Sequence, residues 1–251
     1  MLTSQRKNEI LAMLKQRGQV EAKQLAAHYQ VSEDTIRRDL REMAAEGLLQ
    51  RVHGGALLAS PAEADLAGRQ HIAMPSKAQV AAAAARLIAP GQIVILDGGT
   101  TCAELARCLP RDLPLTVVTH SPTIAVALAE HDKVEVALIG GRLFRHSMVA
   151  MGAAALEALS HIRADLYFMG VTGVHPDAGF STGDYEEAHM KRALSAHAAE
   201  TVVLASAEKL GVASAYKIGE LGMAASLVVD NAPSAELDTA LAAAGVTIVS
   251  Q

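Results

Sequence analysis

Three closely spaced arginines are the first residues in this sequence with a clear chemical use. Ser32 is a suitable N-cap, and the apolar residues that follow it recur at helical spacing: Ile36, Leu40 and Met43. Arg37, Arg38 and Arg41 then lie outside the apolar stripe, where guanidinium groups can reach the phosphates and base edges of DNA. A solvated face, on which the arginines pair with acids one turn away, is the alternative interpretation.

A glycine-threonine run supplies the second candidate chemistry, which is the binding of an anion. Asp97, Gly98, Gly99, Thr100 and Thr101 follow a short apolar strand and open a helix. Glycine N–H groups, the helix N-terminus and the threonine hydroxyls all attract a phosphate, and Asp97 can accept a hydrogen bond from a ligand hydroxyl. A tight turn with an N-cap is the alternative, because the run is neither a Walker loop nor a GxGxxG fingerprint.

Further polar residues extend this candidate ligand site at the ends of strands and on one helix. They are Thr119, His120, Ser121, Gly140, Gly141, Arg142, Glu187 and Lys209. Arg142 and Lys209 suit a phosphate or carboxylate, whereas Ser121 is equally suited to cap the next helix. Glu187 and Lys191 have i,i+4 spacing on a predicted helix, so a helix-stabilising pair and a polar pocket wall are both open.

The N-terminal elements would place the arginines on a DNA-binding helix. Residues 3–17 and 21–29 predict two helices, and only a short turn separates the second from Ser32. Helix, helix, tight turn and helix is the order of a helix-turn-helix domain, whose third helix enters the major groove. The basic run after that helix predicts a β-ribbon with His53 and Gly54 near its tip, which forms a wing. Residues 1–57 are therefore predicted to be a winged helix-turn-helix domain.

The rest of the chain predicts a linker, residues 58–75, and an α/β domain, residues 76–251. The expected strands are residues 92–96, 115–118, 134–139, 166–169, 201–204, 227–229 and 246–249. The expected helices are residues 76–89, with Ser76 as N-cap, 101–108, 122–130, 185–198 and 234–244. Short apolar strands alternating with helices are typical of a mostly parallel sheet covered on both faces. In such a sheet ligands bind at the carboxyl ends of the strands, where the glycine-threonine run lies.

Together these features resemble the DeoR family of bacterial transcriptional regulators. The resemblance rests on Arg6, on the Leu25-Ala26 pair and on the run VSEDTIRRDLREMAAEGLLQRVHGGA, with further matches in DGGTT and around Glu187 and Lys209. It implies an operator-binding domain followed by a sensor domain similar in fold to ribose-5-phosphate isomerase and the CoA-transferases. In that sensor domain the glycine-threonine loop is expected to hold the phosphate of a ligand. Within these motifs the chain departs from the family's pattern at His120 and Glu208.

The helix geometry and the resemblance together predict DNA contacts on the third helix, the wing and the first helix. They are Arg6, Ser32, Thr35, Arg37, Arg38, Arg41, Arg51, His53 and Gly54. Residues 1–56 hold nine Lys or Arg against seven Asp or Glu, whereas the remainder is acidic. Because this excess of basic charge is small, we expect a homodimer or homotetramer that sums its contacts over two half-sites.

Composition excludes several other classes of protein. No run approaches the ~20 consecutive apolar residues of a membrane span, and the charged first helix is unlike a signal peptide. We therefore expect a cytoplasmic protein, associated with the nucleoid when bound to DNA. Its two cysteines form no CxxC pair and no zinc signature, so we expect no metal and no cofactor.

The leading hypothesis is a transcriptional regulator that represses a carbohydrate-catabolism operon and leaves its operator when a phosphorylated sugar or polyol binds. A sugar-phosphate isomerase with an accessory helical domain is the alternative, because Asp97, Asp184 and Glu187 offer carboxylates near the expected pocket. A third hypothesis is an architectural repressor whose pocket binds nothing. The sequence names neither the effector nor the operator.

Overall fold

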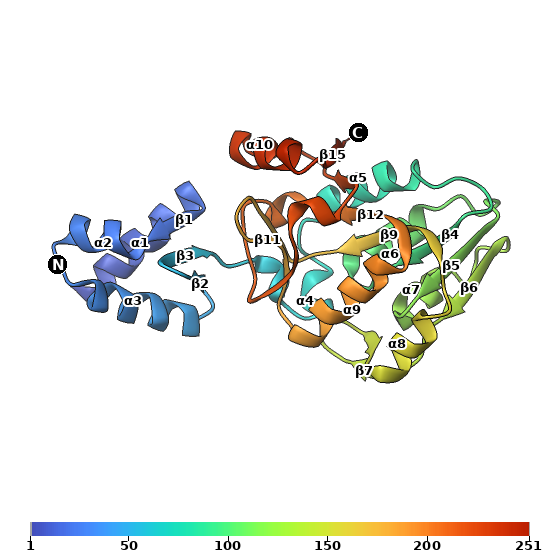
Figure 1. Ribbon diagram of the computed structural model, residues 1–251, viewed down its shortest axis with the longest axis horizontal. Helices are drawn as coiled ribbons and strands as arrows, with labels where there is room; N and C mark the ends of the chain where they lie inside the picture. The colour runs from blue at the N-terminus through green and yellow to red at the C-terminus, as the bar shows by residue number, and fades with distance from the viewer. Residues whose placement is uncertain (1, 251) are drawn as a thin grey trace.

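The computed structural model describes residues 2–250, apart from the side chains of residues 16 and 17, and has two lobes. A small N-terminal lobe and a larger C-terminal lobe are joined by the chain that leaves strand β3 (Figure 1). Within the described residues, no helix is both long and apolar enough to cross a membrane. The two lobes agree with the predicted order of a small DNA-binding domain followed by an α/β domain.

The N-terminal lobe is a winged helix-turn-helix. Its elements are α1 (Thr3–Arg17), β1 (Gln19–Glu21), α2 (Ala22–Tyr29), α3 (Glu33–Ala45), β2 (Leu49–Val52) and β3 (Gly55–Leu58). The apolar stripe of α3 packs against the first two helices through Ile36, Leu40 and Met43, all of which are buried. The three strands pair in the order β1-β3-β2, so β1 extends the wing into a small sheet that the sequence did not predict.

The tip of the wing depends on two glycines. Gly54 follows His53 in the turn between β2 and β3 and has a φ of 80°, a conformation that glycine adopts without strain. Gly55 lies so close to β1 that a Cβ there would be 2.0 Å from the carbonyl oxygen of Val20. This close approach fixes the wing on the helical part of the lobe and leaves its tip exposed.

A seven-stranded parallel sheet forms the centre of the C-terminal lobe, in the order β15-β14-β12-β9-β4-β5-β6. Its strands are β4 (Ile93–Leu96), β5 (Leu115–Thr119), β6 (Val134–Leu138), β9 (Ala164–Gly170), β12 (Ala198–Leu204), β14 (Ser226–Val228) and β15 (Thr247–Val249). All of their pairings are parallel, which confirms the predicted fold class.

Helices cover both faces of this sheet because the apolar strands alternate their side chains between the faces. On β4, Val94 and Leu96 pack toward α5 (Met74–Ala85) and α6 (Thr100–Cys108). Ile95 belongs to the core on the opposite face. That second core includes residues of α8 (Ala153–Leu159), α9 (Tyr185–Ala196) and α10 (Ala235–Ala243). The helix α7 (Pro122–Ala127) lies between β5 and β6 in the chain.

The strand order reverses between β4 and β9. From β4 the chain proceeds outward through β5 to β6, and from β9 it proceeds the other way through β12 to β15. The carboxyl ends of β4 and β9 therefore meet at a topological switch point, where open α/β sheets bind ligands. Asp97 and Gly98 directly follow β4, and Gly170 ends β9.

Smaller elements above the sheet were not predicted. The hairpin β7 (Arg142–Phe144) and β8 (Val149–Met151) and the antiparallel strands β10 (Gly173–His175), β11 (Gly179–Thr182) and β13 (Tyr216–Gly219) are three or four residues long. Such short strands carry little periodicity, and several are buried throughout, so no alternation marks them. The helix α8 escaped prediction for the same reason, since it spans only seven residues.

The segment predicted as the linker, residues 58–75, is ordered and packs on the C-terminal lobe. It contains the short helices η1 (Pro61–Glu63) and α4 (Leu66–Arg69), and the buried side chains of Ala62 and Leu66. The helix α5 begins at Met74 rather than at Ser76, because Pro75 fits the first turn of a helix, where no N–H bond is needed. Ser76 is not its N-cap; the Ser76 hydroxyl accepts a hydrogen bond from the Ala207 N–H at 3.1 Å.

Candidate functional site

The predicted recognition helix α3 presents two exposed arginines without acidic partners. Its N-cap is Ser32, whose oxygen accepts from the Thr35 N–H at 3.3 Å. Arg38 and Arg41 are exposed and form no salt bridge with any other described residue. Arg37 is different, because its guanidinium lies 2.8 Å from the Glu33 carboxylate. The outward face of α3 can therefore offer Arg38 and Arg41 to DNA directly, whereas Arg37 must first leave Glu33.

Arg6 does not belong to this face. Its side chain is 6% exposed, and its Nε donates to the buried carboxylate of Asp39 at 2.6 Å. The hydrogen bond and charge of Asp39 raise the pKa of Arg6 despite burial. Arg6 therefore joins α1 to α3 inside the lobe, and we remove it from the predicted DNA contacts.

The other predicted DNA contacts have mixed positions. Arg51, His53 and Gly54 are exposed on the wing. Thr35 is half-buried, and its hydroxyl lies 2.9 Å from the Ser32 hydroxyl, so both side chains are engaged at the N-terminus of α3. The wing residues remain available to a DNA backbone, while Ser32 has a structural use as a cap.

A pocket opens at the switch point of the C-terminal lobe, lined by residues from several segments of the chain. Of the predicted ligand residues, those that line it are Gly98, Gly99, Thr100, Thr101, Glu187 and Lys209. Lys191, predicted as a possible pocket wall, and Glu208, a departure from the family's pattern, also line the pocket. The remaining charged and hydroxyl-bearing residues of the wall were not predicted: Arg69, Lys77, Ser147, Thr172 and Thr182. The pocket thus draws on segments that are far apart in the chain.

The N-terminus of α6 forms one wall of the pocket. Gly99 precedes this helix with a φ of 107° and provides no side-chain cap. Gly98 packs against β8, where a Cβ would lie 2.2 Å from a methyl carbon of Val149. The first N–H groups of α6, which a helix leaves unsatisfied, therefore meet the pocket, and this arrangement attracts anions.

Two buried lysines stand beside that helix N-terminus. Lys209 donates to the Thr101 hydroxyl at 3.1 Å, and Lys77 donates to the Arg69 carbonyl oxygen at 2.6 Å. Burial lowers the pKa of Lys209 to about 8; the charge of Glu208 opposes this shift, and that of Lys77 adds to it. Burial also lowers the pKa of Lys77. Burial disfavours the charged form of both lysines, and a nearby anion would favour it.

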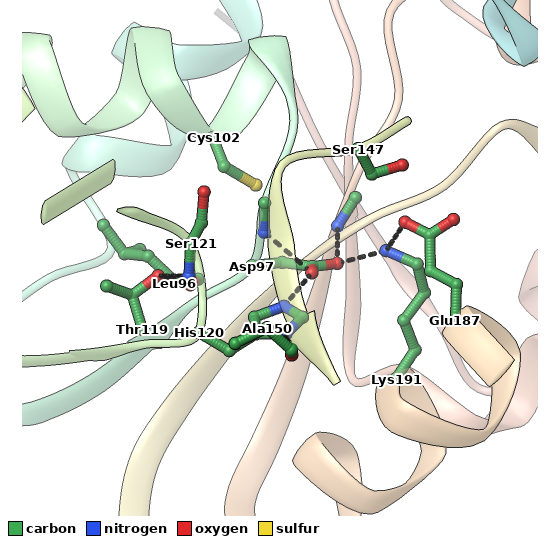
Figure 2. Close-up of polar contacts among 12 residues, drawn as sticks. Leu96, Asp97, Cys102, Thr119, His120, Ser121, Ser147, Ala150, Glu187 and Lys191 are labelled. Atoms are coloured by element: carbon green, nitrogen blue, oxygen red, sulfur yellow. Dashed lines mark hydrogen bonds and ion pairs between the residues drawn. The ribbon is translucent and has the colours of Figure 1, made fainter. Parts of the chain in front are cut away.

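The Asp97 carboxylate lies beneath the pocket floor and uses both of its oxygens (Figure 2). Oδ1 accepts from the Gly98 N–H at 2.8 Å and faces Nε2 of His120 at 3.0 Å. Oδ2 accepts from the Gly170 N–H at 2.9 Å and from Nζ of Lys191 at 2.5 Å. Asp97 therefore ties β4, β5, β9 and α9 together and is corrected from a ligand contact to a residue that positions the loop.

The negative charge of Asp97 is stabilised by the side chains of Lys191 and His120. Burial opposes ionisation of Asp97, but Lys191 and His120 outweigh burial and hold its pKa well below the usual range. Burial likewise opposes the charge of Lys191, and the carboxylates of Asp97 and Glu187 raise its pKa nonetheless. The second nitrogen of His120, Nδ1, lies 2.9 Å from the Ala150 carbonyl oxygen, so both ring nitrogens have a partner.

The run Thr119, His120 and Ser121 is also buried below the pocket rather than in its lining. The Thr119 hydroxyl donates to the Leu96 carbonyl at 2.8 Å (Figure 2). The Ser121 hydroxyl lies 2.8 Å from the Thr123 hydroxyl. We correct these three from ligand contacts to supports of the sheet edge, because their polar atoms are used by the fold.

Gly140, Gly141 and Arg142 lie elsewhere. All three are exposed and lead into β7, and none lines the pocket. Gly141 is needed for the hairpin, since a Cβ there would be 2.8 Å from the Met151 carbonyl oxygen. These residues are corrected in the same way: they shape the β7–β8 hairpin, and they follow β6, the edge strand that β5 separates from β4.

Carboxylates and hydroxyls form the remaining wall. Glu187 Oε2 accepts from the Thr182 hydroxyl at 2.9 Å, and its other oxygen lies 3.6 Å from Lys191. Glu208 Oε1 accepts from Ser206 at 2.7 Å, whereas its Oε2 is buried without a hydrogen-bond partner in the described chain. An acceptor of this kind suits a ligand that brings an O–H or N–H group.

Comparison with known proteins places both lobes in one family. Residues 6–62 match the family described as DeoR-like helix-turn-helix domain, and residues 73–231 match the DeoR C terminal sensor domain. The chain is 34% identical to the HTH-type transcriptional regulator GlpR of Haloferax volcanii over 99% of this chain and 98% of that one. It is 30% identical to the glycerol-3-phosphate regulon repressor of Escherichia coli over 93% of each.

Among solved structures, the chain is similar to ribose 5-phosphate isomerase A from Methanocaldococcus jannaschii. The identity is 19%, the similarity covers 53% of each chain, and the TM-score is 0.40.

Proposed function

The chain belongs to the DeoR family of transcriptional regulators, and from that premise we propose that it represses a carbohydrate-catabolism operon until a phosphorylated sugar or polyol binds its C-terminal lobe. The names of its relatives support this, since they include a glycerol-3-phosphate regulon repressor and a putative aga operon transcriptional repressor. Acting on chromosomal DNA, it would work in the cytoplasm.

The DNA-binding half of the proposal rests on α3 and the wing. Arg38 and Arg41 lie exposed and without acidic partners, as groups that contact phosphates or base edges must be. A single lobe presents few such groups, so operator binding requires two copies on two half-sites, in a dimer or tetramer.

The sensing half rests on one observation, the meeting of the α6 N-terminus with Lys77 and Lys209 in a single pocket. Burial alone would make these lysines unfavourable as cations, and a dianionic phosphate placed among them restores favourable charge pairing. The carboxylates of the same lining, Glu187 and the unpartnered oxygen of Glu208, can accept hydrogen bonds from the hydroxyls of a sugar or polyol.

The same geometry argues against an isomerase. Proton abstraction needs a carboxylate with a free oxygen and a pKa near the working pH. Asp97 is buried, has both oxygens occupied and has a strongly lowered pKa. Asp184 is the N-cap of α9, where it accepts from the Glu187 N–H at 2.9 Å, and Glu187 itself holds Thr182 and Lys191. Of the three carboxylates that the alternative named, Asp97 is therefore closed to catalysis, and Asp184 and Glu187 are each held by the fold through at least one oxygen.

Thermal-shift titration with inorganic phosphate, phosphorylated sugars and phosphorylated polyols tests the proposal. Wild-type protein should melt at higher temperature with phosphorylated compounds than with the parent sugars, because ligands of the native state stabilise it by mass action. Lys209→Met should remove most of that shift. Lys133→Met, an exposed lysine outside the pocket, is the matched control and should keep it.

The best compound is then added to the protein bound to an operator fragment in a mobility-shift assay. Release of the DNA by the compound in wild type, but not in Lys209→Met, is the expected result. A compound that binds equally well with and without DNA is not the inducer, because coupling between two sites is reciprocal. Catalytic interconversion of aldose and ketose phosphates by the protein would overturn the assignment.

A further inference from the structure

Arg69 stands out among the pocket residues because it comes from the segment between the two family matches. Residues 63–72 belong to neither the matched helix-turn-helix domain nor the matched sensor domain. Yet Arg69 and Ile72 line the pocket. Arg69 ends α4, which is carried by the chain that connects the wing to the C-terminal lobe. The connection between the lobes therefore forms part of the pocket wall.

The guanidinium of Arg69 is mostly buried and lacks a carboxylate partner. Among the described residues it forms no salt bridge, and its polar contacts are a 3.3 Å bond to the Ser147 hydroxyl and a 3.4 Å bond from Nε to the Asp65 carbonyl. Burial lowers its pKa, against the more distant charges of Glu187 and Asp97. Since a guanidinium carries five N–H donors, several remain open toward the pocket. A buried arginine in this condition is completed by an anion.

The backbone around Arg69 is held at both ends. Upstream, the Leu66 N–H donates to the His146 carbonyl at 2.8 Å, and Asp65 caps α4 through the Gly68 N–H. Downstream, the Arg69 carbonyl accepts from Lys77, the same lysine that lines the anion pocket. An anion that contacts Lys77 and Arg69 is therefore connected to α4 in two ways: through the Arg69 side chain, and through the Arg69 carbonyl that Lys77 holds.

Only a few residues separate α4 from the wing. Strand β3 ends at Leu58, Ala59 pairs with Ala213 of the C-terminal lobe, and the Ser60 hydroxyl donates to the Thr172 carbonyl. Thr172 also lines the pocket. The segment 59–69 thus touches the pocket at two points and continues directly into the wing (Figure 1).

We propose that Arg69 is a ligand for the bound anion and that this contact transmits occupancy of the pocket to the wing. The inference rests on the proposed function, because it requires an anionic effector in this pocket. When the anion binds, Arg69 holds α4 against the pocket and restrains residues 59–69, which sets the position of the wing relative to the C-terminal lobe. Without Arg69, the anion still meets α6 and the two lysines but no longer acts on the connection.

Hydrogen exchange of the full-length protein, with inorganic phosphate as the probe, tests the proposal. In wild type, phosphate should slow exchange in peptides that cover residues 97–104 and in peptides that cover residues 59–73. In Arg69→Gln, phosphate affinity should fall roughly tenfold, because one charge-assisted contact is lost. At saturating phosphate the variant should still protect residues 97–104 and no longer protect residues 59–73.

Two further variants keep the result decisive. Arg111→Gln removes an exposed arginine paired with exposed Glu130 and should behave as wild type in both regions. Arg69→Lys keeps the charge without the fork, and it should retain part of the affinity while losing most of the protection of the connection, even if Arg69→Gln folds poorly. Protection of residues 59–73 in the Arg69 variants equal to wild type overturns the inference and leaves the proposed function intact. Failure of phosphate to protect residues 97–104 in wild type overturns the proposed function itself.

Discussion

The cations of the two candidate binding sites differ in their exposure to solvent. On α3, Arg38 and Arg41 are exposed to solvent, which lowers the cost of holding each charge and also weakens its interactions. In the C-terminal lobe, Lys77, Lys191 and Lys209 are buried, and each depends on particular neighbouring atoms. The exposed charges suit binding to a polyanion whose phosphates are many and regularly spaced. The buried charges suit recognition of one small anion.

The contrast extends to the acids that accompany these cations. Glu33 pairs with Arg37 on the surface of α3, where either side chain can leave the other for solvent. Asp97 pairs with Lys191 in a site where both side chains are almost fully buried. A buried ion pair resists the loss of one partner far more strongly than an exposed one. Substitutions in buried pairs and in exposed pairs should therefore differ in both size and kind of effect.

The largest expected effect is that of Asp97→Asn on stability. The change leaves Lys191 and His120 buried without their anionic partner and should lower the free energy of unfolding by about 3–5 kcal/mol. Urea unfolding followed by circular dichroism measures this. Arg111→Gln, which breaks an exposed pair, should change the free energy by less than about 0.5 kcal/mol. Equal effects of the two changes would remove the distinction drawn between buried and exposed ion pairs.

The two lobes also differ in what the sequence reveals. Within residues 31–56, the N-cap Ser32, the apolar stripe and the wing glycines follow local rules, and the structure confirms all three. Arg6 was misassigned because its partner Asp39 is distant in sequence, although both lie near apolar helix faces. An acid within the buried stripe of α3 was the available signal for such a pair.

In the C-terminal lobe the strands and the glycine-threonine loop were predictable, and the arrangement of the pocket was not. Parallel pairing brings Lys77, Lys191 and Lys209 together from different helices and loops. The i,i+4 spacing of Glu187 and Lys191 was visible, but that Lys191 reaches Asp97 follows only from the packing of α9 against β9 and β12. Arg69 was missed because its segment has no periodicity and was assigned to a linker. Buried polar partners are non-local, and local rules do not identify them.

A medium effect is expected from pH on anion binding. Burial lowers the pKa of Lys209 to about 8, so this group is protonated below that pH and loses its charge above it. Affinity for sulfate, whose charge is constant in this range, should fall about tenfold between pH 7 and pH 9. Calorimetric titration measures the affinity, and Lys209→Met should bind weakly with a flatter profile. An affinity for sulfate that rises with pH would contradict the claim that protonated Lys209 binds the anion.

The smallest expected effect distinguishes two neighbouring arginines on α3. Arg38 forms no salt bridge in the described chain, whereas Arg37 must give up Glu33 before it meets DNA, which offsets part of the gain. Arg38→Ala should therefore weaken operator binding several-fold and lower the slope of log affinity against log salt by about 1, if its contact is a phosphate. Arg37→Ala should weaken binding less.

Mobility-shift titrations over a range of salt concentrations measure both quantities for each variant. Glu33→Gln provides the matched control, since it frees Arg37 without removing it and should strengthen binding in wild type but not in Arg37→Ala. If Arg37→Ala proves more damaging than Arg38→Ala, the pair with Glu33 orients Arg37 for its contact rather than competing with it. The exposed Arg37–Glu33 pair would then position a side chain for binding, as the buried Asp97–Lys191 pair positions the pocket loop.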